Sequence, residues 1–246
     1  MKFVEVFNNA VKSAKVTTPP TTSGGGGGGG GGGYVQPSVP ETSGKEYTQT
    51  ESTAKDAVEI IGGEQGFFDM AEYAWAEAAV KALASDGVIT GIGNNMFNPE
   101  GTVTREQIAK MIVSALNELD NEATVEYKDV DASGWAYKFI ASAKKSGLMK
   151  GFSETEFAPL SAVTREDLCV ILYRATLKKN KQYKIRKTDF TDKTEIADYA
   201  KDAVEFMSGA GIINGFEDGS FNPKAPATRA QAAVLIYNAL IGGNKQ

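Results

Sequence analysis

Three arginines occupy the same place in a recurring pattern and are the side chains in this sequence best suited to bind an anion. Arg105, Arg165 and Arg229 each follow a threonine, come shortly after a Phe-x-Pro triplet and open an apolar stretch with helical spacing. The helix dipole disfavours a cation in the first turn by up to about 1 kcal/mol, so the placement needs a reason. A guanidinium beside unpaired first-turn amides can hold a carboxylate or phosphate through two hydrogen bonds. An ion pair with an acid of the same or a neighbouring copy is the alternative.

The threonines before these arginines are typical of helix N-caps. A capping hydroxyl accepts a hydrogen bond from a first-turn amide, and a polar residue three positions later completes a capping box. We therefore predict a structural role for the threonines and a binding role for the arginines, so that replacing all three arginines by alanine should abolish binding and leave the thermal transition nearly unchanged. The pattern occurs as Thr104 with Gln107, Thr164 with Asp167, and Thr228 with Gln231.

Each copy also begins with an aromatic-x-Asp pattern, and a second aromatic residue follows six or seven positions after the aspartate. Asp is a common turn residue and an aromatic ring at a helix start is often a core wedge, so both have structural readings. The alternative is ligand contact, because an aromatic ring suits the face of a sugar and Asp adds polar contacts. With the arginines, these residues describe a site for an acidic sugar. The candidates are Asp69, Asp129, Asp192, Trp75, Trp135, Tyr199 and three loop glycines, Gly91, Gly151 and Gly215.

The elements that must position these residues form one unit, present three times. In the first copy an apolar helical stripe runs from Ala76 to Leu83, Gly87 is placed to cap that helix, a loop spans 91–103 and a second helix starts at Thr104. The motif arginines lie 60 and 64 positions apart, as internal repeats require. One helix-loop-helix cannot bury both of its apolar stripes, so the copies must pack together, either as a short solenoid or as a closed pseudo-threefold bundle.

Composition excludes several classes of function. The formal net charge is −5 and the pI is about 5.0, which argues against a general nucleic-acid binder. The chain has no histidine and one cysteine, so it has no histidine-based triad and no intrachain disulfide, and we expect neither a metal site nor a cofactor. Cys169 lies in an apolar run and is predicted to be inert core. No segment reaches membrane-spanning length, so we expect no membrane insertion.

The N-terminal part has a different character. Residues 1–16 have helical apolar spacing and are predicted to form a short helix or the remnant of an upstream domain, but they lack the unbroken apolar stretch of a signal peptide. Residues 17–66 are rich in Gly, Thr, Ser and Pro and include ten consecutive glycines from Gly24 to Gly33. This composition predicts a disordered, flexible linker that holds the repeats away from any cargo domain upstream.

Taken together, the repeats resemble the S-layer homology family, whose three tandem repeats attach bacterial surface proteins to the cell wall. The resemblance spans 67–240 and rests on the aromatic-x-Asp start, the Trp-Ala helix of copies one and two, the Phe-x-Pro loop and the signature that the family usually writes Ile-Thr-Arg-Ala-Glu. The last Glu of this signature is replaced in every copy, by Gln107, Asp167 and Gln231, and the third copy has Tyr199 where the others have Trp.

The resemblance implies a mainly α fold in which three helix-loop-helix repeats form a pseudo-threefold bundle, at 67–120, 127–177 and 190–241. It also implies a ligand, secondary cell-wall polysaccharide, often pyruvylated, bound in grooves between repeats with its carboxylate on the motif arginine. The chain is thus identified as a noncatalytic anchor of the bacterial cell surface, cell wall or S-layer. Two other functions stay open: a protein-binding scaffold of the surface layer, and a wall-glycan hydrolase, although the aspartates recur once per copy rather than as a pair in one cleft.

Overall fold

A computed structural model describes residues 66–180 and 182–242, all of which belong to one compact unit spanning 53–246. The helix predicted in residues 1–16 and nearly all of the predicted linker, 17–66, lie outside the described residues.

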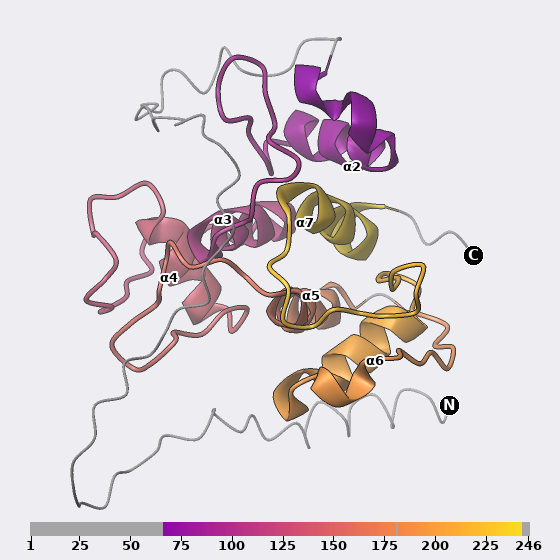
Figure 1. Cartoon of the computed structure of the whole chain (residues 1–246). Helices are drawn as coiled ribbons and strands as arrows, with labels where there is room; N and C mark the ends of the chain where they lie inside the picture. The colour runs from indigo at the N-terminus through magenta and orange to yellow at the C-terminus, as the bar shows by residue number, and fades with distance from the viewer. Residues whose placement is uncertain (1–65, 181, 243–246) are drawn as a thin grey trace, which may run out of the picture. The chain divides into compact units, whose positions relative to one another are not determined.

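Each repeat consists of a short first helix, a loop and a second helix (Figure 1). The first helices are α2 (Ala74–Ser85), α4 (Tyr137–Lys145) and α6 (Lys201–Gly209), and the second helices are α3 (Arg105–Leu116), α5 (Arg165–Lys179) and α7 (Arg229–Ile236). Short turns of 3-10 helix precede two of the first helices, at η2 (Phe68–Tyr73), η3 (Lys193–Glu195) and η4 (Asp198–Ala200), and a π-helical turn, η5 (Tyr237–Ile241), continues α7. The mainly α fold is confirmed.

A glycine ends each first helix, as predicted for the first copy. Gly87 has φ +68°, its amide donates to the Ala84 carbonyl over 3.0 Å, and the next amide, of Val88, donates to the Leu83 carbonyl over 2.9 Å. This pair of bonds is a Schellman motif, which needs a left-handed residue that glycine supplies without strain. The other repeats use Gly147 and Gly211 in the same way.

The second helices form the centre of the bundle and each also packs on the first helix of the following repeat. Helices α3, α5 and α7 contact one another, while the pairs α3 with α4, α5 with α6 and α7 with α2 lie side by side (Figure 1). The last of these pairs joins the third repeat to the first. The arrangement is therefore closed, which excludes the solenoid and confirms the pseudo-threefold bundle.

A ring of three backbone hydrogen bonds marks the centre of this closure. Val103 donates to the carbonyl of Ala227, Ala227 donates to Val163, and Val163 donates back to Val103, over 2.8 to 3.0 Å. All three residues are buried, so each bond replaces one that the backbone would otherwise make to water. The residues just before the three helix starts are thereby held together.

The core also explains the cysteine. Cys169 is fully buried on α5, and burial raises the pKa of its thiol far above the ordinary value. The thiolate is the reactive form of cysteine, so Cys169 is an inert part of the core, as its apolar surroundings in the sequence predicted.

Candidate functional site

The predicted arginines and aspartates come together where the start of each second helix packs against the loop of the next repeat. We call these places junctions: the first is formed by the start of α3 and the second repeat, the second by the start of α5 and the third repeat, and the third by the start of α7 and the first repeat. The loop that enters each junction contains the Phe-x-Pro triplet, at 157–159, 221–223 and 97–99 respectively.

The threonines cap these helix starts, as predicted. The hydroxyls of Thr104 and Thr228 accept from the amides of Gln107 and Gln231 over 3.4 and 3.2 Å, and both glutamine side chains accept in return from the threonine amide. In the second repeat the shorter Asp167 instead accepts from the Thr164 hydroxyl over 2.8 Å. The capping box is therefore complete in two of the three repeats.

The first-turn amides are not unpaired. The amides of Arg105 and Glu106 donate to the carbonyls of Ser161 and Pro159, each over 3.0 Å, and the equivalent amides at 165, 166, 229 and 230 donate to the next loop in the same way. These bonds join the repeats and leave no amide donors for an anion. The prediction that helix-start amides contribute to the site is therefore wrong, because the next repeat already satisfies them.

The arginine side chains bridge the same two repeats. At the first junction Arg105 Nε donates to the Phe157 carbonyl over 2.7 Å and a terminal nitrogen donates to the Lys150 carbonyl over 2.7 Å. The guanidinium lies 4.6 Å from the centre of the Phe157 ring, a cation–π distance. Arg229 repeats all three contacts with Phe97 and Thr90.

None of these arginines forms an ion pair with a carboxylate in the described part of the chain. Every ion pair among residues 66–180 and 182–242 uses a lysine, so the predicted alternative of an arginine ion pair is wrong there. Arg165 and Arg229 are only 7% and 8% exposed. Burial lowers the pKa of all three motif arginines, to about 10 for Arg229, so they stay charged at neutral pH. At each junction an aspartate of the next repeat, Asp129, Asp192 or Asp69, raises the pKa of the arginine against this effect of burial, without forming an ion pair with it. A cation without a paired carboxylate is a candidate for binding an anion.

The three aspartates hold the Phe-x-Pro loops. Asp69 accepts from the amides of Phe97 and Asn98 over 2.8 and 2.6 Å, and Asp129 and Asp192 make the same pair of bonds in their own repeats. For Asp129, burial raises the pKa, but the two amide bonds and Arg105 outweigh it and leave the pKa below its usual value. The aspartates therefore shape the loop whose carbonyls receive the motif arginines, and direct ligand contact by them stays a prediction.

These amide bonds stabilise a left-handed residue in each loop. The residue after the phenylalanine has φ 59° at Asn98, 58° at Ala158 and 55° at Asn222. Asn tolerates this conformation, whereas Ala pays a steric penalty of about 1 kcal/mol. The second repeat therefore carries local strain that the other two avoid.

The three loop glycines lie against the first aromatic residue of their own repeats. A Cβ on Gly91 would come within 2.8 Å of the Phe67 ring, and Gly151 and Gly215 meet Tyr127 and Phe190 equally closely. The close approach explains the glycines structurally. Their predicted contact with a carbohydrate remains a prediction.

The second aromatic residue of each repeat lies on the surface. Trp75 is 57% exposed, Trp135 56% and Tyr199 47%. A core wedge would be buried, so that reading is wrong for all three, and their rings are accessible to a ligand. Exposed indoles of this kind can pack on a sugar ring.

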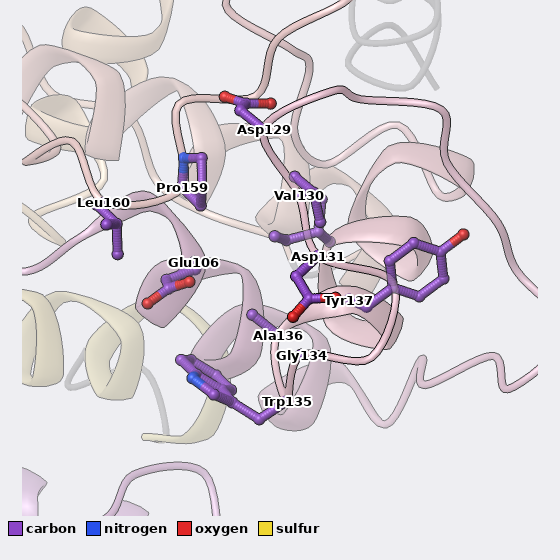
Figure 2. A pocket seen from close by; sticks show the side chains of 11 residues that line it. Glu106, Asp129, Val130, Asp131, Gly134, Trp135, Ala136, Tyr137, Pro159 and Leu160 are labelled. Atoms are coloured by element: carbon purple, nitrogen blue, oxygen red, sulfur yellow. The ribbon is translucent and has the colours of Figure 1, made fainter. Parts of the chain in front are cut away.

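The first junction contains a cavity of about 200 Å³ lined by both repeats. Figure 2 shows Glu106 from the start of α3 and Trp135 from the second repeat at this cavity, with Asp131 and Leu160 also in its wall. Burial raises the pKa of Glu106, and no described residue donates a hydrogen bond to its carboxylate. The cavity wall combines two aromatic side chains, Trp135 and Tyr137, with acidic groups, and Arg105 is not part of it.

The second junction is filled by its own side chains. Glu166 is only 2% exposed and accepts from the amide of Ala197 over 3.0 Å and from the ammonium of Lys224. The Tyr199 hydroxyl lies 3.2 Å from Glu166 and 2.8 Å from Asp167. Arg165 also donates to Gln231 over 3.3 Å. The polar groups here satisfy one another.

The third junction has fewer acidic groups. Ala230 takes the place of Glu106 and Glu166, and a second cation, Lys110, lies 3.4 Å from the Thr90 hydroxyl. Arg229 donates to the carbonyl of the same Thr90 over 2.9 Å. Lys110 was not predicted as a site residue, although comparing the three copies would have singled it out, because Val170 and Val234 occupy its position in the others.

Comparison with known proteins agrees with this architecture. A family model of the S-layer homology domain matches residues 66–109, 126–169 and 189–233, which are more than half of the chain. The chain therefore belongs to the S-layer homology family, with three tandem repeats, as the sequence resemblance indicated.

Several curated relatives share the repeats. The chain is 34% identical over 168 residues to an amylopullulanase from Thermoanaerobacterium thermosulfurigenes, covering 68% of this chain and 9% of that protein. It is 35% identical over 172 residues to exoglucanase XynX from Acetivibrio thermocellus, covering 69% and 16%, and 36% identical over 165 residues to the surface-layer 125 kDa protein of Lysinibacillus sphaericus, covering 66% and 14%. The chain thus spans less than a fifth of the length of each of these relatives.

Two further features hold for residues 66–180 and 182–242. No helix in this part is both long and apolar enough to cross a bilayer. No group of three or more acidic or cysteine side chains there is placed to hold a metal ion.

Proposed function

We propose that the three repeats anchor a surface protein to the bacterial envelope by binding secondary cell-wall polysaccharide, without catalysis, at the junctions between repeats. The relatives include, by name, a surface-layer protein, an amylopullulanase and an exoglucanase, and the family match covers the repeats they share. The simplest explanation for similar repeats in proteins of different activities is that the repeats form a common binding module.

The observation that carries the proposal is the set of motif arginines, of which Arg165 and Arg229 are buried and Arg105 is partly buried. Each contacts a phenylalanine ring and at least one backbone carbonyl of the next repeat, and none forms an ion pair with a carboxylate among the described residues. A pyruvate ketal would supply the missing negative charge, and the exposed Trp75 or Trp135 would pack on its sugar. Several junctions on one repeating polymer would raise avidity without a new type of contact.

The arginines also stabilise the fold, so alanine variants at these positions cannot test binding alone. Replacing one by alanine would leave buried carbonyls without donors, at a cost of about 1–3 kcal/mol each. The triple alanine variant should therefore lose stability as well as binding, contrary to the expectation from sequence. Exposed aromatic residues make better probes.

Cosedimentation with purified wall polymer tests the proposal. We expect the chain to sediment with native polymer and to lose most binding after mild acid removes pyruvate, while Trp135→Ala weakens binding about tenfold without lowering the thermal transition. Leu119→Ala, which removes another exposed apolar side chain, is the control. Equal binding to the pyruvate-free polymer would contradict the carboxylate mechanism.

The same assay separates the two alternatives. Failure to bind any wall polymer, together with binding to surface-layer protein, would favour the scaffold. Release of reducing ends from the polymer would favour the hydrolase.

A further inference from the structure

The third junction contains a lysine that neither other junction has. Lys110 lies on α3, half-buried, at a position that is valine on α5 and α7. Its ammonium contacts the Thr90 hydroxyl at 3.4 Å, and Thr90 also accepts from Arg229 through its carbonyl. Two cations from different helices, α3 and α7, therefore meet at one residue of the first repeat.

These two cations repel each other in a partly dehydrated place. Burial and the charge of Arg229 both lower the pKa of Lys110, and burial lowers that of Arg229. Like charges held together away from water are unfavourable unless an anion joins them. The other two repeats have valine at the position of Lys110, so the fold does not require a charged residue there.

One acid among the described residues is shown to act on the pair. The charge of Asp69 raises the pKa of Arg229, although Asp69 forms no ion pair with it and accepts from two loop amides. Glu166 has no counterpart here because Ala230 takes its place. Asp167, which faces Arg105 at the first junction, corresponds to the neutral Gln107 at the third. Neither Lys110 nor Arg229 belongs to any ion pair of the described residues.

We propose that Lys110, Arg229 and the Thr90 hydroxyl form the principal anion subsite of this chain, and that it takes an acidic group carried on a hexose, either a carboxylate or a phosphate. The inference rests on the proposed polysaccharide binding and adds which junction holds the charged group and which second residue recognises it. Lys110 supplies a compact point charge, whereas Arg229 supplies planar donors, so together they can contact two oxygens of one anionic group.

Titration calorimetry on the full chain tests the subsite with two defined probes. One is a methyl hexopyranoside with a 4,6-linked pyruvate ketal and the other is glucose 6-phosphate, each compared with its uncharged parent sugar. We expect Lys110→Gln to weaken the preferred probe about tenfold, and Lys110→Arg to keep most of the affinity. Lys81→Gln is the matched control, because Lys81 is an exposed lysine of α2 and its loss changes the net charge equally; it should change affinity less than twofold.

The outcomes separate this inference from the proposed function. If the wild-type chain binds the ketal and Lys110→Gln binds it equally well, the subsite is wrong while polysaccharide binding stands. If only glucose 6-phosphate binds and Lys110→Gln weakens it, the subsite stands and the pyruvate mechanism fails. If neither acidic probe binds better than its uncharged parent, the subsite is overturned, and polymer cosedimentation then decides the proposed function by itself. Thermal transitions of all variants must match the wild type within a few degrees for these comparisons.

Discussion

The second and third junctions share their backbone hydrogen bonds but differ in charge: the second contains a buried carboxylate, and the third contains an additional cation. At the second, Glu166 is buried among the Ala197 amide, Tyr199 and Lys224, and Arg165 donates to Gln231. At the third, Ala230 removes that carboxylate while Lys110 adds a cation beside Arg229.

Within one repeated motif, this difference assigns stability mainly to the second junction and ligand binding mainly to the third. Both junctions keep the arginine bond to a phenylalanine carbonyl, which holds neighbouring repeats together. What varies is the other side chains near the arginine: Gln231 accepts from Arg165 at the second junction, whereas Lys110 adds a second positive charge near Arg229 at the third. A junction whose polar groups bond to one another stabilises the bundle, whereas a junction with an excess of positive charge can bind an anionic ligand.

The largest expected effect concerns stability at the second junction. Glu166→Ala should lower the free energy of unfolding by about 3 kcal/mol, because it removes one partner of a buried charge network and leaves the others unpaired. Urea unfolding measures the change.

Glu106→Ala is the matched control at the first junction, where burial raises the glutamate pKa and no described donor reaches the carboxylate. It should cost under about 1 kcal/mol. Equal losses in the two variants would contradict the claim that the second junction is satisfied by its own residues.

The next effect concerns binding at the third junction. Ala230→Glu should add a carboxylate in the first turn of α7, one residue after Arg229, and weaken an acidic hexose probe by more than tenfold, or about 1.4 kcal/mol. Calorimetry measures the affinity. Ala230→Gln has nearly the same shape without the charge and should weaken the probe much less; if both variants bind alike, crowding rather than charge is responsible.

A smaller effect follows from the Tyr199 hydroxyl. Tyr199→Phe should lower the free energy of unfolding by about 1 kcal/mol at neutral pH, since it removes a hydrogen bond to a carboxylate. Polymer binding should change little, because the ring remains.

This difference should also depend on pH. Burial, followed by Asp167 and Glu166, raises the pKa of Tyr199 above its ordinary value of 10.0. A folded-state pKa raised above the unfolded one contributes stability that is present below pH 10 and lost as the pH rises above it. The wild type should therefore lose its advantage over Tyr199→Phe between about pH 10 and 11.5, and a constant difference across that range would contradict the hydrogen bond.

The smallest expected effect is on the thermal transition and comes from relieving strain in one loop. The loops of the second and third junctions have Asn222 and Asn98 at the left-handed position, whereas the first has Ala158. Ala158→Asn should raise the thermal transition by a few degrees, equivalent to about 0.5–1 kcal/mol. Asn98→Ala should lower it by a similar amount, and no change in either variant would show that the loop tolerates both residues.

The repeat architecture was predictable because its signals are local and occur three times. Threonine caps, the glycine that ends the first helix and the apolar stripes each act within a few residues, so their spacing in the sequence suffices. The position of the exposed indoles also follows from local spacing, although the choice between core and surface does not.

The charge pattern of the junctions was not predictable in this way. Arg165 reaches Phe221, and Arg229 reaches Phe97 from 132 positions away, only because the bundle closes. The partners of Glu166 come from η4, from the residue before η4 and from the loop before α7, a set that no spacing in the sequence identifies. The sequence comparison marks Lys110 as unusual, but only the packing of the third repeat on the first places it near Arg229.

Arginine side-chain NMR offers the most direct test of the difference between the junctions. The Nε–H signals of Arg105, Arg165 and Arg229, assigned through single Arg→Lys variants, would be followed while the ketal-bearing hexopyranoside is added. We expect the Arg229 signal to shift first and to saturate at the calorimetric affinity, while the Arg165 signal stays nearly still. An Arg165 shift at the same or lower concentration would contradict this expectation.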